Sequence, residues 1–266
     1  MRDSMMDDEA FGELTARQAD IVRMVDEKGY ATLEALAQHF EVSTQSIRRD
    51  IIQLDRLNLL QRFHGGAGPS DTTVRLGYVE KRMRAMDAKA RIGRAAAALV
   101  PEGAAVFLDV GTTVEAVALQ LRTQHAKARV FTSSLASGMI LAGAPDIELH
   151  VFAGAVRGAD GSLAGAATVA GVSAIRFDIA FIGYSGFEKD GTVMDYDLEK
   201  IAVKQAAMRR AETSVIVGDC SKFERHGVAQ VAAPHLISKL VTDAAPPSHL
   251  AEAFSAARLE IVIAGP

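Results

Sequence analysis

The spacing of hydrophobic positions changes along the chain near residue 90. Before that point, apolar residues recur every three or four positions, which is the period of one face of a helix. After it, short apolar runs alternate with longer amphipathic stretches. The change predicts a small helical part followed by an α/β part.

Three helices are expected in the first part. Thr15–Lys28 has one apolar side and ends at Gly29, and Thr32 caps a second helix that reaches Phe40. A three-residue turn, 41–43, leads to a third helix. Helix, short turn and second helix is the order of a helix-turn-helix, in which the second helix enters the DNA groove.

The third helix has two chemically different faces. Its apolar stripe is Ile47, Ile51, Leu54 and Leu57. Its polar face, which opens at the N-cap, consists of Ser43, Thr44, Gln45, Ser46, Arg48 and Arg49. Glutamine can pair with adenine and arginine with guanine, so this face suits reading of the major groove, although an ordinary amphipathic surface helix has the same pattern.

A wing is expected after this helix. The segment 59–63 alternates like a short strand, and a glycine-rich turn follows it. Arg62, His64 and Gly65 would then lie at the phosphate backbone. Residues 15–64 carry seven Lys or Arg and seven Asp or Glu, so DNA binding would rest on the local placement of arginines and not on a basic field.

These patterns predict the domain organisation. Residues 13–68 form the winged helix-turn-helix, 69–89 a linker with a connector helix, and 90–266 an α/β domain that senses a metabolite. The basic stretch 75–94 is predicted to be helical, either as a solvated connector or as a face near DNA phosphates.

Seven strands alternating with helices are expected in the second part. The strands are 105–109, 129–132, 148–153, 178–183, 214–218, 239–242 and 260–263. The helices are 91–100, 114–122, 135–141, 168–175, 197–211 and 247–257. This order is typical of a mostly parallel sheet, which binds ligands beyond the carboxyl ends of its strands.

Small polar residues follow most of these strands. Gly111, Thr112 and Thr113 precede a helix whose free N–H groups favour an anion, and Lys222 could add a charge from another strand end. The candidate ligand-binding residues are Asp109, Gly111, Thr112, Thr113, Ser133, Gly154, Gly183, Ser185, Glu199, Asp219 and Lys222. We therefore expect a small phosphorylated ligand at this edge.

The carboxylates near these strand ends leave two kinds of chemistry open. They are Asp109, Asp195, Glu199 and Asp219. Such groups could transfer protons in a sugar-phosphate isomerase or accept hydrogen bonds from a bound ligand, and their spacing does not decide between the two. Cys220 has no activating partner in the sequence, and the seven histidines lack metal-ligand spacing, so no metal or cofactor is expected.

The composition indicates in which cellular compartment the protein is expected. The 266 residues have a formal charge of −4 and a single cysteine, which excludes an internal disulfide and fits a reducing cytoplasm. No apolar run approaches the ~18 residues that a membrane helix needs. The acidic segment 1–9 is unlike a signal peptide and is predicted to be a disordered lead-in, so no membrane association is expected.

Five segments occur in a characteristic order along the chain. They are 42–50, 62–67, 109–113, 197–204 and 219–223. Together they resemble the DeoR family of bacterial sugar-metabolism repressors, from about Thr15 to Pro247. Ser133, Ala153 and Ala166 stand where the family often has asparagine, glycine, and glutamate or proline.

The resemblance implies a winged helix-turn-helix joined to an effector domain similar to ribose-5-phosphate isomerase and the CoA-transferases. It also implies a transcriptional repressor, not an enzyme, that binds double-stranded operator DNA as a homodimer or homotetramer. A phosphorylated sugar or polyol, with glycerol 3-phosphate as the specific candidate, would release it. The alternatives are an isomerase-like enzyme carrying a DNA-binding domain and a protein-interaction module.

Overall fold

The computed structural model describes residues 14–28, 31–57, 59–63, 66–69, 78–158 and 160–265. The chain divides into two compact units, the N-terminal unit of residues 1–76 and the C-terminal unit of residues 77–266. The predicted lead-in and the wing turn at His64 and Gly65 lie outside the described residues.

Three helices make up most of the N-terminal unit. They are α2 (Ala16–Lys28), α3 (Leu33–His39) and α4 (Thr44–Arg56). Thr32 caps α3, because its hydroxyl accepts from the Ala35 N–H at 3.0 Å. Ser43 caps α4 in the same way, accepting from the Ser46 N–H at 3.2 Å. The predicted helix-turn-helix is therefore confirmed.

A small antiparallel sheet completes this unit. The strand β2 (Leu60–Phe63) pairs with β3 (Gly66–Pro69), and these two strands form the predicted wing. The strand β1 (Ala31–Thr32) pairs with the other side of β3; it was too short for its period to be recognised in the sequence. The unit has a hydrophobic core of its own, whose fully buried members are Ile21, Val25, Leu36, Ile47, Ile51, Leu54 and Ala67.

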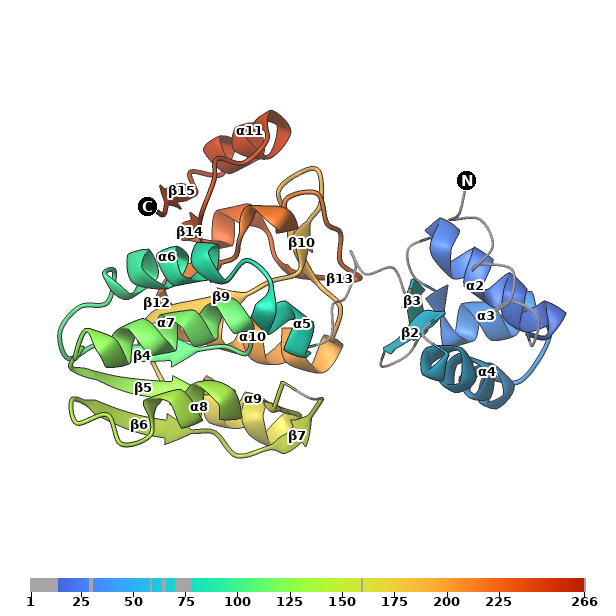
Figure 1. Cartoon of the computed structure of the whole chain (residues 1–266), viewed down its shortest axis with the longest axis horizontal. Coiled ribbons are helices and arrows are strands. Elements are labelled where there is room, and N and C mark those ends of the chain that lie inside the picture. The colour runs from blue at the N-terminus through green and yellow to red at the C-terminus, as the bar shows by residue number, and fades with distance from the viewer. Residues whose placement is uncertain are drawn as a thin grey trace. The chain divides into compact units, whose positions relative to one another are not determined.

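A seven-stranded parallel sheet forms the centre of the C-terminal unit (Figure 1). In spatial order its strands are β15 (Glu260–Ile263), β14 (Lys239–Thr242), β12 (Ala211–Val217), β9 (Phe177–Gly183), β4 (Ala105–Leu108), β5 (Ala128–Thr132) and β6 (Ile147–Val151). Each of them overlaps one of the seven predicted strands, and every pairing within the sheet is parallel. The predicted α/β fold is therefore confirmed.

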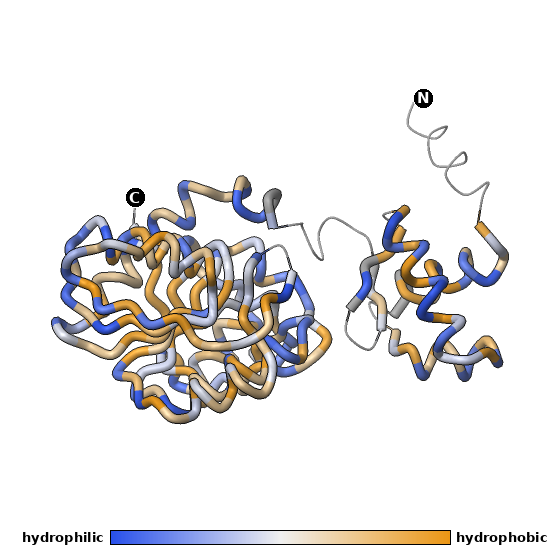
Figure 2. Tube along the Cα trace, turned by 90° about the horizontal axis from the view of Figure 1, so that it is seen from below, coloured by the Kyte–Doolittle hydropathy of each residue, from blue (hydrophilic) through white to orange (hydrophobic). Residues whose placement is uncertain are grey.

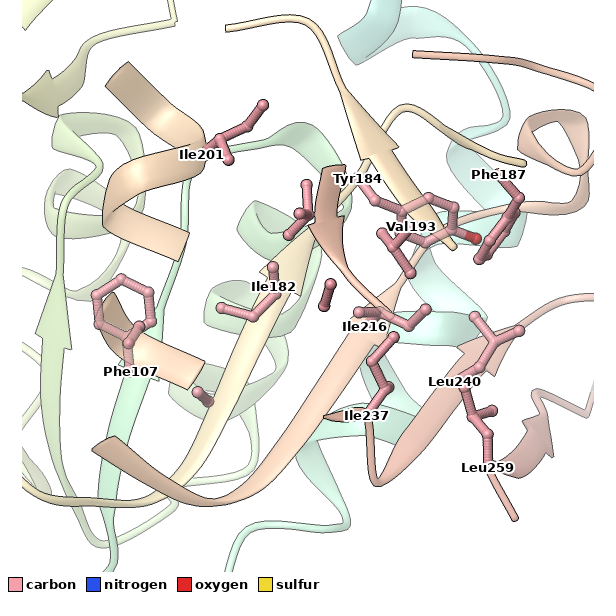
Figure 3. Close-up of a cluster of buried hydrophobic side chains, with 14 of the residues drawn as sticks. Phe107, Ile182, Tyr184, Phe187, Val193, Ile201, Ile216, Ile237, Leu240 and Leu259 are labelled. Atoms are coloured by element: carbon pink, nitrogen blue, oxygen red, sulfur yellow. The ribbon is translucent and has the colours of Figure 1, made fainter. Parts of the chain in front are cut away.

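Helices cover both faces of this sheet. One face carries α6 (Met86–Ala97), α7 (Thr112–Thr123) and α8 (Leu135–Leu141), and the other carries α9 (Ala166–Ser173), α10 (Leu198–Arg210) and α11 (Ser248–Ala256). Successive strand residues enter opposite cores, so Val106 and Leu108 face the first group of helices and Phe107 the second. Figure 3 shows the second core, which Ile182 and Ile216 enter from β9 and β12. Burial on both faces explains why β4 and the later residues of β9 and β12 are continuous apolar runs. Figure 2 colours hydrophobic residues orange along the chain.

The predicted basic connector helix is broken in the structure. Its first part is α5 (Tyr78–Met83), and Ala85, whose φ of +51° is left-handed, separates it from α6. The ammonium of Lys89 donates to the carbonyls of Lys81 and Arg84. These are carbonyls that the end of a helix leaves without backbone partners, so Lys89 stabilises the break.

Short strands that the sequence did not reveal surround the ends of the sheet. The strands β7 (Ala155–Arg157) and β8 (Ser162–Ala164) form a hairpin. The strands β10 (Gly186–Phe187), β11 (Val193–Asp195) and β13 (Ala229–Ala232) form a second small sheet. Two short 3-10 helices, η2 (Cys220–Lys222) and η3 (Pro234–Leu236), lie on either side of β13 in the sequence.

Candidate functional site

The polar face of α4 is exposed. Ile47, Ile51 and Leu54 on the opposite face are fully buried. The exposed members of the polar face are Ser43, Thr44, Gln45, Arg48 and Arg49, and Ser46 is half-buried. Within the described residues, Arg48 and Arg49 form no ion pair or hydrogen bond, so both guanidinium groups are available to an external acceptor.

Asp50, on the same helix, is used inside the unit. Its carboxylate accepts from Arg17 Nε at 2.8 Å and from Gln18 Nε2 at 3.3 Å. Gln18 also donates to Gln53 Oε1 at 3.0 Å. These contacts join the start of α2 to α4. They fix the orientation of α4, so that its polar face points to solvent.

The wing is joined to the same helix. The backbone N–H of Arg62, on β2, donates to the Asp55 carboxylate of α4 at 2.9 Å, and the Arg62 side chain is exposed. The backbone of this residue is thus fixed while its guanidinium group faces solvent. The other two predicted wing contacts, His64 and Gly65, are outside the described residues.

Parallel pairing places several predicted ligand residues along one edge of the large sheet. Leu108 pairs with Thr132 and Phe181, and Val217 pairs with Gly183, so β4, β5, β9 and β12 end within two residues of one another. Asp109, Ser133, Gly183 and Asp219 therefore lie along one edge, which we call the carboxyl edge. Asp109 is 1% exposed and Ser133 is 2% exposed, so both are covered by the surrounding chain.

Lys204 of α10 is the centre of a buried charge cluster at the carboxyl edge. Its ammonium donates to the Asp109 carboxylate and to the Gly183 carbonyl, the latter at 2.8 Å, and lies 3.3 Å from an oxygen of Asp195. The Gly183 N–H donates back to Asp109 at 3.0 Å. Because an ammonium has three donors, Lys204 has none left for a ligand.

The electrostatics of this cluster are set by burial and by close charges. Burial raises the pKa of Asp109, although Lys204 opposes the rise. Burial also opposes ionisation of Asp195, but Lys204 and hydrogen bonds from Ser185 Oγ (2.7 Å) and the Tyr196 N–H (2.8 Å) lower its pKa to about 2. The two carboxylates in turn raise the pKa of Lys204 against the effect of its burial.

The first turn of α7 is the candidate anion site. Gly111, whose φ is +139°, precedes this helix and supplies no side-chain cap. Thr113 is 3% exposed and Thr112 is half-buried. The backbone N–H groups of this turn and Thr112 are thus the parts of the predicted Gly-Thr-Thr site that a ligand could reach.

Lys222 adds a cation at the carboxyl edge. Its ammonium donates to the Tyr184 carbonyl at 2.6 Å and lies 4.8 Å from the centre of the Tyr184 ring. No other hydrogen bond of this ammonium involves the described residues, so two of its three donors remain for a ligand. Burial lowers the pKa of Lys222 to about 8, although Asp219 opposes the fall.

Lys89 is a further cation that the sequence did not reveal. It is 7% exposed, and burial lowers its pKa while Asp219 and Glu115 raise it. It therefore lies within electrostatic reach of two carboxylates, Glu115 in the first turn of α7 and Asp219 after β12. A positive charge thus interacts with a carboxylate of the α7 turn and with a carboxylate of the loop that contains Lys222.

The remaining predicted residues have partners inside the protein. A Cβ at Gly154 would come within 2.1 Å of Thr168 Oγ1, so this position requires glycine for the approach of α9. Glu199 pairs with Arg157 of β7 at 3.4 Å. Asp219 caps η2 by accepting from the Ser221 N–H at 3.1 Å.

Three charged residues near the carboxyl edge, Lys204, Lys89 and Glu115, could not be recognised as site residues from the sequence patterns. Each is a charged residue on a helix, where the usual expectation is exposure to solvent. The one available signal was periodicity, because Lys204 shares its side of α10 with Lys200 and Ala207, which are also buried. A lysine on the buried side of a helix needs an acidic partner, but no pattern identified Asp109, 95 residues away.

Two protein families match the chain. The family described as the DeoR-like helix-turn-helix domain matches residues 17–75, and the DeoR C terminal sensor domain matches residues 84–244. The chain belongs to the DeoR family. The resemblance expected from the sequence is confirmed.

The relatives of this DeoR-family chain are repressors. It is 34% identical to the glycerol-3-phosphate regulon repressor of Escherichia coli (strain K12) over 88% of this chain and 92% of that protein. It is 30% identical to the HTH-type transcriptional repressor CsqR of the same organism over 94% and 97%.

Solved structures resemble about half of this chain at a lower level. Ribose 5-phosphate isomerase A from Methanocaldococcus jannaschii is 17% identical, with a TM-score of 0.39 over 52% of this chain and 54% of that one. This similarity is too low to support an inference about activity.

Proposed function

We propose that this DeoR-family protein is a sequence-specific DNA-binding repressor whose hold on its operator is weakened by a phosphorylated sugar or polyol. The polar face of α4 carries the proposal, because it presents Gln45, Arg48 and Arg49 to solvent on a helix that Asp50 holds in place. Glutamine and arginine are the side chains that make paired hydrogen bonds to adenine and guanine.

The carboxyl edge supports the ligand part of the proposal. The uncapped first turn of α7 and the free donors of Lys222 are groups that bind phosphate. Glycerol 3-phosphate is the first candidate, in view of the 34% identity to the glycerol-3-phosphate regulon repressor. A ligand can release DNA only by binding more tightly to a conformation that holds DNA poorly.

The proposal also includes an oligomeric state and a cellular compartment. Helix-turn-helix repressors commonly bind two half-sites as symmetric dimers, so we infer a homodimer or homotetramer acting in the cytoplasm. No helix in the described ranges is both long enough and apolar enough to cross a bilayer.

DNA binding is tested by replacing the two arginines of the polar face. Genomic fragments retained by the parent protein serve as the DNA, and the double variant Arg48→Ala, Arg49→Ala is compared with Arg23→Ala, an exposed arginine of α2. A base contact is worth about 1–3 kcal/mol, so the double variant should bind at least tenfold more weakly and Arg23→Ala should bind normally. Full affinity in a folded double variant would refute the assignment of α4.

Ligand release is tested with a panel of phosphorylated metabolites. A ligand at 100 times its dissociation constant should stabilise the fold by about 2.7 kcal/mol, which a thermal shift detects. The ligand found should release the DNA, and unphosphorylated glycerol should not. Lys222→Ala should keep DNA binding and lose release. A variant that releases DNA as readily as the parent would show that phosphate is bound elsewhere.

A further inference from the structure

Glu115, in the first turn of α7, has one carboxylate oxygen that accepts no hydrogen bond from the described residues. The residue is 6% exposed, and Oε1 has no hydrogen-bond partner among the described residues. A buried carboxylate oxygen without a donor is costly, because it has lost its hydration and gained nothing in return. A hydrogen-bond donor on a bound ligand would satisfy this oxygen.

The other oxygen of the same carboxylate holds α5. Tyr78, the first residue of α5, donates from its hydroxyl to Glu115 Oε2 at 3.1 Å. In the sequence, α5 is the first described element after the wing. Within the described residues, one oxygen of Glu115 therefore accepts a hydrogen bond from α5 and the other accepts none.

Glu115 Oε1 lies close to the candidate anion site. Glu115 is three residues beyond Thr112, so its Cα lies about 4.5 Å further along the α7 axis. Side chains on helices point back toward the N-terminus, which directs this carboxylate toward the uncapped turn. A molecule with phosphate on the turn and a hydroxyl a few bonds away spans that separation.

The charges around Glu115 favour a hydroxyl over a second anionic group. Burial raises the pKa of Glu115, and Tyr78, Arg82 and Lys89 oppose the rise, whereas Asp160 adds to it. An acceptor with carboxylate character repels phosphate but accepts readily from a hydroxyl. Phosphate should therefore lie on the N–H groups at the start of the α7 turn, where Lys222 can also reach it, with the hydroxylated carbon chain directed toward Glu115.

We propose that Glu115 joins the ligand to the connector: a ligand hydroxyl donates to Oε1 while Tyr78 donates to Oε2, so that the bound ligand holds α5 against α7. This inference rests on the proposed function and adds two features to it. It names the group that distinguishes a hydroxylated phosphate from a plain one, and it names the contact through which occupancy reaches the connector.

The hydroxyl contact is tested with three probes. They are glycerol 3-phosphate, ribose 5-phosphate and n-propyl phosphate, which has no hydroxyl. The parent should bind one of the hydroxylated probes about tenfold more tightly than n-propyl phosphate. Glu115→Met should bind both kinds equally, Glu115→Gln should keep part of the preference through its amide oxygen, and the matched control Glu252→Met, at an exposed position of α11, should behave as the parent.

The link to α5 is tested by limited proteolysis. Trypsin can cut at three basic residues in and after α5, namely Lys81, Arg82 and Arg84, and mass spectrometry follows the cuts. The preferred probe should slow this cleavage severalfold in the parent. Tyr78→Phe should keep the preference for the hydroxylated probe but lose the protection. If Glu115→Met does not fold, Tyr78→Phe still tests the link between the ligand and α5.

Three results would overturn the inference, and they are distinguishable. A hydroxyl preference that survives Glu115→Met would exclude the contact with Oε1. Protection of α5 that is absent in the parent, or unchanged in Tyr78→Phe, would exclude the link to the connector. If no probe binds the parent, the proposed function fails as well as the inference.

Discussion

At the scale of single residues, the two lysines of the carboxyl edge have opposite roles. Lys204 uses all three of its donors inside the protein, whereas Lys222 uses one. Two positive charges at the same edge of a sheet are thus not equivalent. Lys204 stabilises the carboxyl edge, and Lys222 can donate to a ligand.

Replacing Lys204 with methionine should destabilise the C-terminal unit by about 3–5 kcal/mol, because Asp109 and Asp195 would remain buried without a counter-ion. Urea unfolding followed by circular dichroism measures the change. Lys239→Met, which removes a half-buried partner of the exposed Glu260, should cost less than about 1 kcal/mol. Equal effects of the two substitutions would contradict the structural role of Lys204.

The pKa of Lys222 predicts how ligand affinity depends on pH. Its pKa of about 8 lies below the ordinary 10.5, so the ammonium is lost as the pH rises through 8. Phosphate affinity should then fall by up to about tenfold per pH unit above pH 8. The free protein should instead gain stability between pH 8 and 10.5, because the unfolded chain binds more protons there.

Calorimetric titrations at pH 7.5 and 9.5 measure this dependence. Lys222→Arg is the control, since arginine stays charged throughout this range and should give nearly constant affinity. A parent protein whose affinity does not change between these pH values would mean that Lys222 does not contact the phosphate.

At the scale of elements, the cap of α4 can be separated from DNA contact. Ser43→Ala removes the hydroxyl that accepts from the Ser46 N–H and should destabilise the N-terminal unit by about 1 kcal/mol. Ser43→Asp should restore stability but not DNA affinity, because its carboxylate caps the helix and repels phosphate. Thermal unfolding and DNA titration of the two variants distinguish these effects. Recovery of both properties in Ser43→Asp would place Ser43 away from the DNA.

The elements that the sequence predicted are those with a clear period or a clear cap. The apolar runs identify all seven strands of the large sheet, and Ser43 marks the start of α4. The sequence did not predict the break at Ala85, because alanine normally continues a helix. The contacts of Lys89 that stabilise the break are visible only in the three-dimensional structure.

The site was predictable only in outline, for a related reason. Residues placed directly after strands, such as Asp109 and Asp219, lie at the carboxyl edge as a parallel sheet requires. Their partners are on helices far away in the sequence. The buried contact of Asp109 with Lys204 and the contact of Glu115 with Tyr78 therefore needed the three-dimensional structure.

At the scale of the whole molecule, the carboxyl edge is built to hold groups in place and is poorly suited to proton transfer. Asp195, with a pKa of about 2, stays ionised and is a weak base, and Lys204 is saturated. We therefore expect no turnover of ribose 5-phosphate or glycerol 3-phosphate in an NMR assay. Sustained conversion that disappears in Asp195→Asn would favour the isomerase alternative instead.

The separate hydrophobic core of the N-terminal unit allows the two units to evolve independently. Since Ile21, Leu36 and Ile51 pack within residues 14–67, substitutions that alter the polar face of α4 leave the packing of the other unit unchanged. Gene fusion or recombination near residue 76 could then give an existing metabolite response a new set of target genes. Lineages of such proteins would be expected to change their DNA sites and their ligands independently of each other.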